Sequence, residues 1–166
     1  MLTEKLLGYT KNNIAVYFDR DSGHAATHFT KHLNLEATVK NYLNMINGTG
    51  EIVRCDFDTE TNIGKTDLVE TNENDDIIYA LRAGRTTYSR FCKNKSPQLT
   101  SWITIDIRRR PDDNYSLYTA FIGRQTPSFP GGDIMAEQSI EFWARHALAW
   151  GSQEIVPGTE TLVCPW

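Results

Sequence analysis

Three histidines recur at steps of four residues in the first quarter of the chain: His24, His28 and His32. In an α-helix this spacing places all three imidazole rings along one face. Imidazole exchanges protons near neutral pH and is also a common zinc ligand. The stripe therefore has three interpretations: histidines without a chemical role, an acid–base site, or a metal site. Because a straight helix carries the third ring a further turn away, and no CxxC or HExxH motif accompanies it, we expect neither a metal ion nor a cofactor.

A basic and aromatic segment covers residues 77–93 (IIYALRAGRTTYSRFCK). Guanidinium groups bind phosphate through a planar fork, and tyrosine rings stack on bases. Arg85 and Arg90 are therefore candidates for holding a phosphoryl group, and Tyr88 is a candidate for contacting a base. A solvated basic face beside core aromatic residues explains the same pattern. Gly84 makes a single long helix through this segment less favourable.

The elements that must position these groups centre on residues 101–123 (SWITIDIRRRPDDNYSLYTAFIG), which predict two strands joined by a turn. Isoleucines alternate with polar or larger residues in the first strand, which is the period of a half-buried strand. The turn is Pro111-Asp112-Asp113-Asn114, where proline presets φ and the Asp and Asn side chains can bond their own backbone. A four-residue loop pairs Arg110 with Tyr115.

This register divides the hairpin into an apolar and a semi-polar face. The expected apolar face holds Ile103, Ile105, Ile107, Tyr118, Ala120 and Ile122. The expected semi-polar face holds Thr104, Asp106, Arg108, Leu117, Thr119 and Phe121. We expect the apolar face to pack on the core and the semi-polar face to line a cleft. Asp106 and Phe121 are therefore candidate substrate-binding residues.

The remaining periodicities predict an α+β fold: an antiparallel sheet of about five strands, with helices on one face and a C-terminal helix. Residues 1–13 are expected to form a short helix or lead-in. Further expected elements are strands over 14–18 and 51–57, helices beginning near His24 and over 34–46, and a helix over 134–150 capped by Asp133. A chain of 166 residues fits a single domain, 1–166.

Composition limits the function classes. The net charge is −4, which argues against nucleic-acid binding through a global positive field but leaves room for a local basic groove. No apolar run is long enough for a membrane span, and the N-terminal residues do not read as a secretory signal. Cys55, Cys92 and Cys164 are odd in number and show no paired spacing, which is typical of reduced thiols. We expect a cytoplasmic protein without a membrane partner.

Two segments carry a resemblance when they are taken together. Residues 22–28 (SGHAATH) enter the first predicted helix through a glycine and a histidine. Residues 103–110 (ITIDIRRR) are followed by 118–121 (YTAF) in the hairpin. The combination resembles the RNase A-like toxin domains of bacterial contact-dependent inhibition systems, which are grouped with the barnase/EndoU/colicin/RelE-like ribonucleases. The whole chain is also similar to small bacterial proteins without an established activity that share the segments YSRF, TAFIG and CPW.

The toxin resemblance implies an active site that joins the early histidines to the late hairpin. It implies that His24 or His28 acts with Thr119 and with a cation that the match does not define. Phe121 stands where the family has a tyrosine, so that hydroxyl is missing here. The implied reaction is metal-independent RNA cleavage, for which Arg85 and Arg90 are the candidate cations and RNA is the expected partner.

A rival interpretation belongs to a different class of protein. Mild acidity and a tryptophan-rich C-terminal segment also suit a non-catalytic cytoplasmic binding protein. An immunity-type accessory protein, whose acidic segment 67–76 masks a cognate basic protein, is a variant of this interpretation. Convergence of the histidines with Thr119 in a basic setting would favour the enzyme.

Overall fold

The computed structural model describes residues 3–132 and 135–166. Contacts between Cα atoms divide the chain into two compact units, each made of two chain segments. Unit 1 comprises Met1–Gly64 and Thr100–Gln125, and unit 2 comprises Lys65–Leu99 and Thr126–Trp166. The expectation of one domain over residues 1–166 stays a prediction, and each unit is described by itself.

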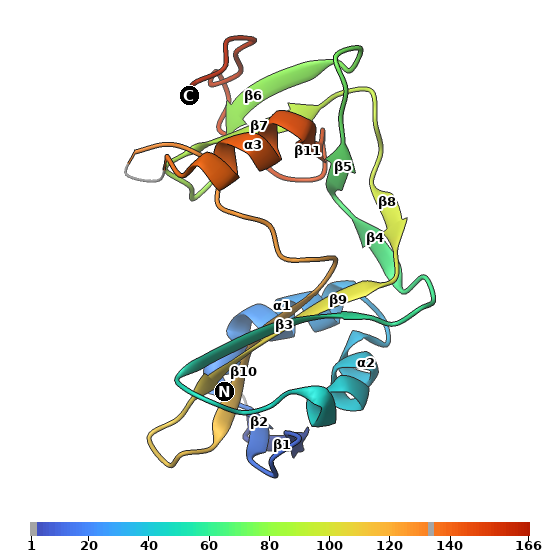
Figure 1. Ribbon diagram of the computed structural model, residues 1–166, viewed down its shortest axis with the longest axis vertical. Helices are drawn as coiled ribbons and strands as arrows, with labels where there is room; N and C mark the ends of the chain where they lie inside the picture. The colour runs from blue at the N-terminus through green and yellow to red at the C-terminus, as the bar shows by residue number, and fades with distance from the viewer. Residues whose placement is uncertain (1–2, 133–134) are drawn as a thin grey trace. The chain divides into compact units, whose positions relative to one another are not determined.

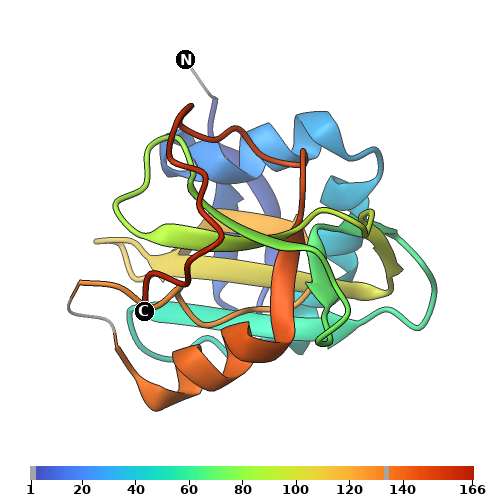
Figure 2. The ribbon, with the colours of Figure 1, turned by 90° about the horizontal axis from the view of Figure 1, so that it is seen from above.

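Unit 1 is built on a five-stranded sheet (Figure 1). In sheet order its strands are β1 (Lys5–Tyr9), β2 (Ala15–Phe18), β10 (Tyr115–Ile122), β9 (Trp102–Arg109) and β3 (Ile52–Asp58). All neighbours are antiparallel except β2 and β10, which pair in parallel over two residues of each strand. The strands β3, β9 and β10 form the long part of this sheet (Figure 2).

The helices of unit 1 follow β2. They are a 3-10 turn η1 (Arg20–Ser22), α1 (Gly23–Lys31), α2 (Leu35–Tyr42) and a second 3-10 turn η2 (Leu43–Met45). Asp19 begins η1 through a capping box, because its side chain accepts from Asp21 N while Ser22 Oγ accepts from Asp19 N. α1 packs against β10. His32 follows the last helical residue in extended conformation, so the expected histidine stripe holds for His24 and His28 only.

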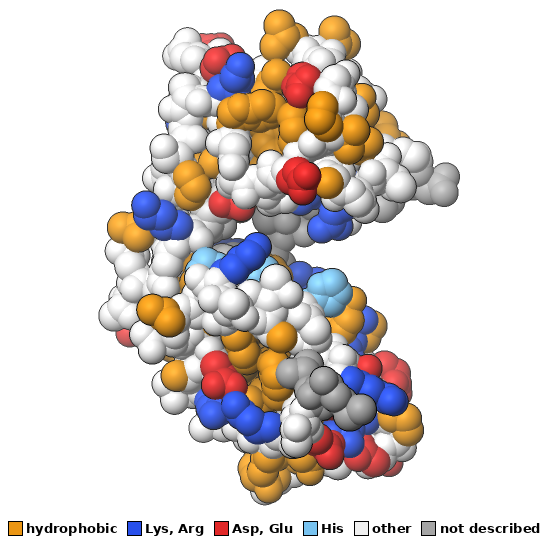
Figure 3. Space-filling view, turned by 180° about the vertical axis from the view of Figure 1, so that it is seen from behind, with side chains coloured by type: hydrophobic (Ala, Val, Ile, Leu, Met, Phe, Trp, Pro, Cys, Tyr) orange, Lys and Arg blue, Asp and Glu red, His pale blue; other side chains and the backbone are white. Residues whose placement is uncertain are grey.

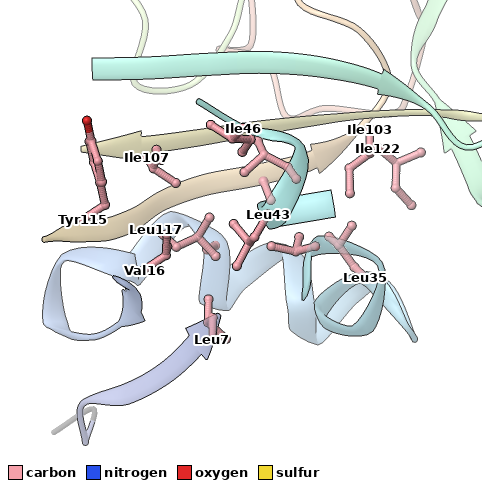
Figure 4. Packing of buried hydrophobic residues seen from close by; sticks show 14 residues of the cluster. Leu7, Val16, Leu35, Leu43, Ile46, Ile103, Ile107, Tyr115, Leu117 and Ile122 are labelled. Atoms are coloured by element: carbon pink, nitrogen blue, oxygen red, sulfur yellow. The ribbon is translucent and has the colours of Figure 1, made fainter. Parts of the chain in front are cut away.

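The core of unit 1 lies between the sheet and the two helices (Figure 4). Alternate side chains of β9 enter it, as the hydrophobic pattern predicts, and β10 adds Tyr115, Leu117, Ala120 and Ile122. Its fully buried members include Val16, Val39, Leu43, Ile46, Ile103, Ile105, Ile107, Tyr115 and Leu117. The first strand, Lys5–Tyr9, replaces the expected helix or lead-in. It adds Leu7 to the same core by pairing with β2, a tertiary contact that local propensity does not register.

A β-bulge at Tyr118 divides the hairpin of β9 and β10. Ile103, Thr104, Ile105 and Asp106 keep the predicted partners, from Ile122 down to Thr119. Beyond the bulge the register shifts by one residue, so Leu117 faces Ile107 and is fully buried. Leu117 and Tyr118 thus exchange the faces expected for them. The loop has five residues instead of four, since Tyr115 pairs with Arg109.

Unit 2 contains a four-stranded sheet and one helix (Figure 1). In sheet order the strands are β5 (Leu68–Glu70), β11 (His146–Ala149), β7 (Tyr88–Cys92) and β6 (Ile77–Leu81). Two short strands, β4 (Gly64–Thr66) and β8 (Gln98–Thr100), pair where the chain passes from one unit to the other. The C-terminal tail lies beside β6 and the residue after it, with isolated antiparallel bridges between Tyr79 and Thr161 and between Arg82 and Ile155.

The helix of unit 2, α3 (Glu137–Arg145), is shorter than the sequence indicates. The helical pattern over 134–150 is wrong for 146–149, which form β11 between β5 and β7. Burial of this segment in the middle of a sheet outweighs its helical spacing. Asp133, the predicted cap, lies outside the described residues. Trp143 stacks on Phe129 with ring centroids 3.8 Å apart and anchors α3 to the core of unit 2.

The α+β class, the five-stranded sheet and the C-terminal helix are thus confirmed. In the part of the chain that the structure describes, no helix has the length and apolarity needed to cross a membrane.

Candidate functional site

One face of the long strands in unit 1 is polar, and it lies opposite the core. Alternation along β3, β9 and β10 brings a common set of side chains to this face. They are Arg54, Asp56, Thr104, Asp106, Arg108, Thr119 and Phe121. Five of the six residues expected on the semi-polar face lie here: Thr104, Asp106, Arg108, Thr119 and Phe121. The sixth, Leu117, is in the core.

A buried carboxylate organises this polar face. The side chain of Asp106 is fully buried and accepts two hydrogen bonds from Arg108, at 2.8 Å from Nε and 3.1 Å from Nη2. Arg54, its register partner on β3, places Nη1 3.7 Å from Asp106 Oδ2. The hydrogen bond from Arg108 to Asp106 raises the pKa of this guanidinium. Asp106 therefore holds two arginines side by side, with one positive charge in excess.

The first arm of the site joins Arg108 to a histidine through Tyr118. Arg108 Cζ lies 4.0 Å from the centroid of the Tyr118 ring, which is a close cation–π contact. The imidazole of His24 lies 5.2 Å from the same ring, centroid to centroid. The bulge permits this contact, since it turns Tyr118 away from the core position that an uninterrupted strand would give it.

The second arm also joins an arginine to a histidine, through a phenylalanine instead of a tyrosine. Arg54 Cζ lies 5.4 Å from the centroid of the Phe121 ring. His28, one helical turn after His24, has its ring centroid 6.2 Å from that of Phe121. Two histidines of α1 thus border the polar face through two aromatic residues of β10. Histidine side chains reach the molecular surface in the space-filling view (Figure 3).

Thr119 lies between the two aromatic residues in the sequence of β10 and opposite Asp106 on β9. The residue is 9% exposed. Its hydroxyl makes no side-chain hydrogen bond to any other described residue, so it can donate to a ligand. We call the set His24, His28, Arg54, Asp106, Arg108, Tyr118, Thr119 and Phe121 the histidine–arginine cluster.

The electrostatic setting of His28 favours its neutral form. Partial burial lowers the pKa of His28 below 6.5, and the charges of Lys31, His32 and His24 lower it further. The imidazole is therefore unprotonated at neutral pH and can accept a proton. Because the pKa is lower in the folded than in the unfolded chain, His28 favours unfolding as the pH falls below 6.5.

A titration of the imidazole signals by NMR checks this state. We expect the His28 midpoint to lie below 6.5 and to rise in Lys31→Gln, which removes one repulsive charge. Lys40→Gln, on α2, makes the same charge change at an exposed site and serves as the control. A midpoint at or above 6.5, or equal responses to the two substitutions, would contradict the electrostatic account.

The other predicted site residues lie in unit 2. Arg85 is exposed after the turn that follows β6, and Tyr88 begins β7. Arg90 Nη1 donates to Thr71 Oγ1 at 2.7 Å and to the His146 carbonyl at 3.0 Å. The structure thus brings His24, His28, Asp106, Thr119 and Phe121 together in one unit. A role for Arg85, Arg90 and Tyr88 beside the histidines stays a prediction.

Sequence reasoning missed two members of the cluster and left a third unassigned. Arg54 becomes visible only when β3 pairs with β9, and no local pattern indicates that pairing. The alternating pattern places Tyr118 on the core face, because nothing in the sequence indicates the bulge. Arg108 was placed on the polar face but received no role, although its spacing of two residues from Asp106 on one strand face already predicts their contact.

The two arginines after Arg108 are held away from the cluster by partners of their own. Arg109 donates to Tyr115 Oη at 3.0 Å. Arg110 forms ion pairs with Glu4, Asp19 and Asp112. The ion pairs of Arg110 border a cavity of about 430 Å³, lined by Glu4, Asp19, Arg20, Asp21, Arg110, Pro111 and Asp112. The hairpin tip is therefore anchored by ion pairs rather than being a free basic patch.

Comparison with known proteins adds no relative: no protein-family model, curated protein or solved structure matches the chain. Within residues 3–132 and 135–166, no three side chains of His, Cys, Asp or Glu are grouped so that they could hold a metal ion. What the site can do must accordingly be inferred from its own geometry.

Proposed function

We propose that unit 1 is a ribonuclease-like unit that cleaves RNA at the histidine–arginine cluster, using side chains alone. One observation carries the proposal: two imidazoles, two guanidinium groups and a free hydroxyl border the same sheet face. The resemblance to toxin ribonucleases adds support, because its early histidine and late threonine are among these residues.

RNA cleavage without an external nucleophile needs a base, an acid and groups that stabilise charge on the phosphate. His28 takes the role of the base, because its lowered pKa keeps it neutral. It removes the proton from the ribose 2′-oxygen, which forms a new bond to phosphorus. The bond between phosphorus and the 5′-oxygen breaks, and His24 is the acid that gives that oxygen a proton. The products are a 2′,3′-cyclic phosphate and a free 5′-hydroxyl.

Charge on the non-bridging oxygens is stabilised by the other polar groups of the cluster. Arg54 and Arg108 offer the guanidinium N–H groups that Asp106 does not occupy, and their side chains are 40% and 37% exposed. Thr119 donates its hydroxyl from β10, which pairs with β9 on the side opposite β3. Since Asp106 is buried beneath the arginines, its part is to position them rather than to contact the substrate. Phe121 contributes an apolar wall at the second arm.

The direct test is incubation of the purified protein with end-labelled RNA in EDTA. We expect the parent to cut RNA and to leave a single-stranded DNA of the same sequence intact, because DNA lacks the 2′-hydroxyl. His24→Ala, His28→Ala and Thr119→Ala should each slow cutting, and the products should carry 2′,3′-cyclic phosphates. Intact RNA with the parent, or equal cutting by all variants, would remove the proposal in favour of a non-catalytic binding or immunity-type protein.

A further inference from the structure

A second basic feature lies in unit 2, at the loop between β6 and β7. Arg82 follows β6 and is partly buried. Its guanidinium donates from Nε to Ser89 Oγ at 2.7 Å and from Nη1 to Gln153 Oε1 at 2.9 Å. Its Cζ lies 5.4 Å from the centroid of the Phe129 ring. All three partners are uncharged.

No carboxylate of the described chain forms an ion pair with Arg82, although ion pairs hold Arg54, Arg108, Arg109, Arg110 and Arg124. Glu154 is close in the backbone, since its carbonyl accepts from Ala83 N at 3.1 Å, but its carboxylate is not within ion-pair distance of Arg82. The charge therefore stays uncompensated, and burial together with the nearby charge of Arg85 lowers the pKa of Arg82. A partly desolvated cation without a counter-charge is unfavourable unless an anion arrives.

The rest of this loop offers donors. Arg85 is exposed, and its amide bonds back to the Arg82 carbonyl at 3.1 Å, closing a turn in which Gly84 has φ of +77°. Thr86 and Thr87 follow before β7 begins. Within the described part of the chain, the hydroxyls of these threonines and the amides of Gly84, Thr86 and Thr87 have no hydrogen-bond partner. The loop thus gathers two guanidinium groups, two hydroxyls and three amides, with no acidic side chain among residues 82–87.

We propose that residues 82–87 (RAGRTT) form a binding site for a phosphoryl group. Arg85 can offer its guanidinium fork to a tetrahedral anion, and Arg82 can add its Nη2 group, since its Nε and Nη1 donate to Ser89 and Gln153. Backbone amides in a turn add oriented donors of the kind that bind phosphate elsewhere. The ligand is either a free phosphate or the backbone of a nucleic acid, since both present the same oxygens. This site lies outside the histidine–arginine cluster and does not depend on cleavage.

The test uses probes that the proposed ribonuclease cannot consume. Amide signals of the ¹⁵N-labelled full chain are followed during titration with inorganic phosphate and, separately, with a ten-residue oligothymidylate, which lacks 2′-hydroxyls. We expect the largest shifts at Gly84, Arg85, Thr86 and Thr87. Shifts with both probes identify a general phosphoryl site, and shifts with the oligonucleotide alone identify a nucleic-acid backbone site. Either result supports the proposal.

Variants decide whether the loop is responsible. Arg85→Gln, at an exposed position, should weaken binding about tenfold, which is the usual effect of losing a charged hydrogen-bond donor. Arg145→Gln removes the same charge from the exposed last turn of α3 and should leave affinity unchanged. Arg82→Lys, which keeps the charge but not the fork, should weaken binding while the protein stays folded. Loop signals that do not move with either probe, or equal losses in Arg85→Gln and Arg145→Gln, would overturn the site even if RNA cleavage is found.

Discussion

Substitution of His28 by alanine is expected to lower the rate of RNA cleavage by about 10²- to 10⁴-fold, the usual contribution of a general base. The imidazole borders Phe121 on the polar face, and its lowered pKa keeps it able to accept a proton. The fold should persist, because His28 is only partly buried and makes no side-chain hydrogen bond to the described residues. Single-turnover cleavage of a labelled RNA measures the change.

The matched control is His32→Ala. His32 lies four residues further along but outside α1, in extended conformation, so its loss should leave the rate within about twofold of the parent. Removing the charge of His32 also raises the pKa of His28. The acidic limb of the pH–rate profile should therefore lie at higher pH in His32→Ala than in the parent. In the parent that limb should fall below 6.5, since cleavage is lost as His28 becomes protonated. Equal rates for His28→Ala and His32→Ala would rule out His28 as the base.

Asp106→Asn is expected to cost about 2 kcal/mol of unfolding free energy, although it changes only one atom. The carboxylate is fully buried, accepts two hydrogen bonds from Arg108 and forms an ion pair with Arg54 at 3.7 Å. An amide removes the negative charge and turns one acceptor into a donor facing two cations. The cost stays below the about 3–5 kcal/mol of a completely buried pair, because both guanidinium groups keep part of their solvent contact.

Urea denaturation of parent and variant measures this difference. Asp113→Asn is the matched control, as Asp113 is on the same hairpin, 85% exposed, and paired with Arg109 only at 3.6 Å. Its effect should stay within about 0.5 kcal/mol. A double-mutant cycle with Arg108→Gln should give a coupling energy of about 1–3 kcal/mol. A coupling near zero would show that Asp106 does not hold Arg108 as described.

Local sequence patterns were sufficient to predict those features that depend on one strand or one helical turn alone. The alternation around Ile103, Ile105 and Ile107 predicted the buried face of β9, and the entry at Ser22 predicted the start of α1. Polar neighbours on the opposite face, such as Asp106 and Thr119, were placed correctly for the same reason. These features depend on periods of two and four residues, which the sequence displays directly.

Long-range pairing decided the rest. The partnership of Arg54 with Asp106 depends on β3 lying beside β9, and 146–149 became a strand because β5 and β7 receive it on both sides. Neither pairing can be recognised from the few residues on either side of the strand in the sequence. A position of Arg85 and Arg90 beside the histidines stays a prediction, because local density of charge does not indicate the unit to which a residue belongs.

Because Tyr118 is the extra residue of the bulge, the number of residues in β10 determines whether an aromatic ring lies beside Arg108. If that strand lost Tyr118, the ladder would close without interruption with Leu117 still opposite Ile107, and the aromatic ring beside Arg108 would be lost. A length change within this strand therefore alters the polar face. The spacing between Leu117 and Thr119 should accordingly be kept fixed in any redesign of this protein.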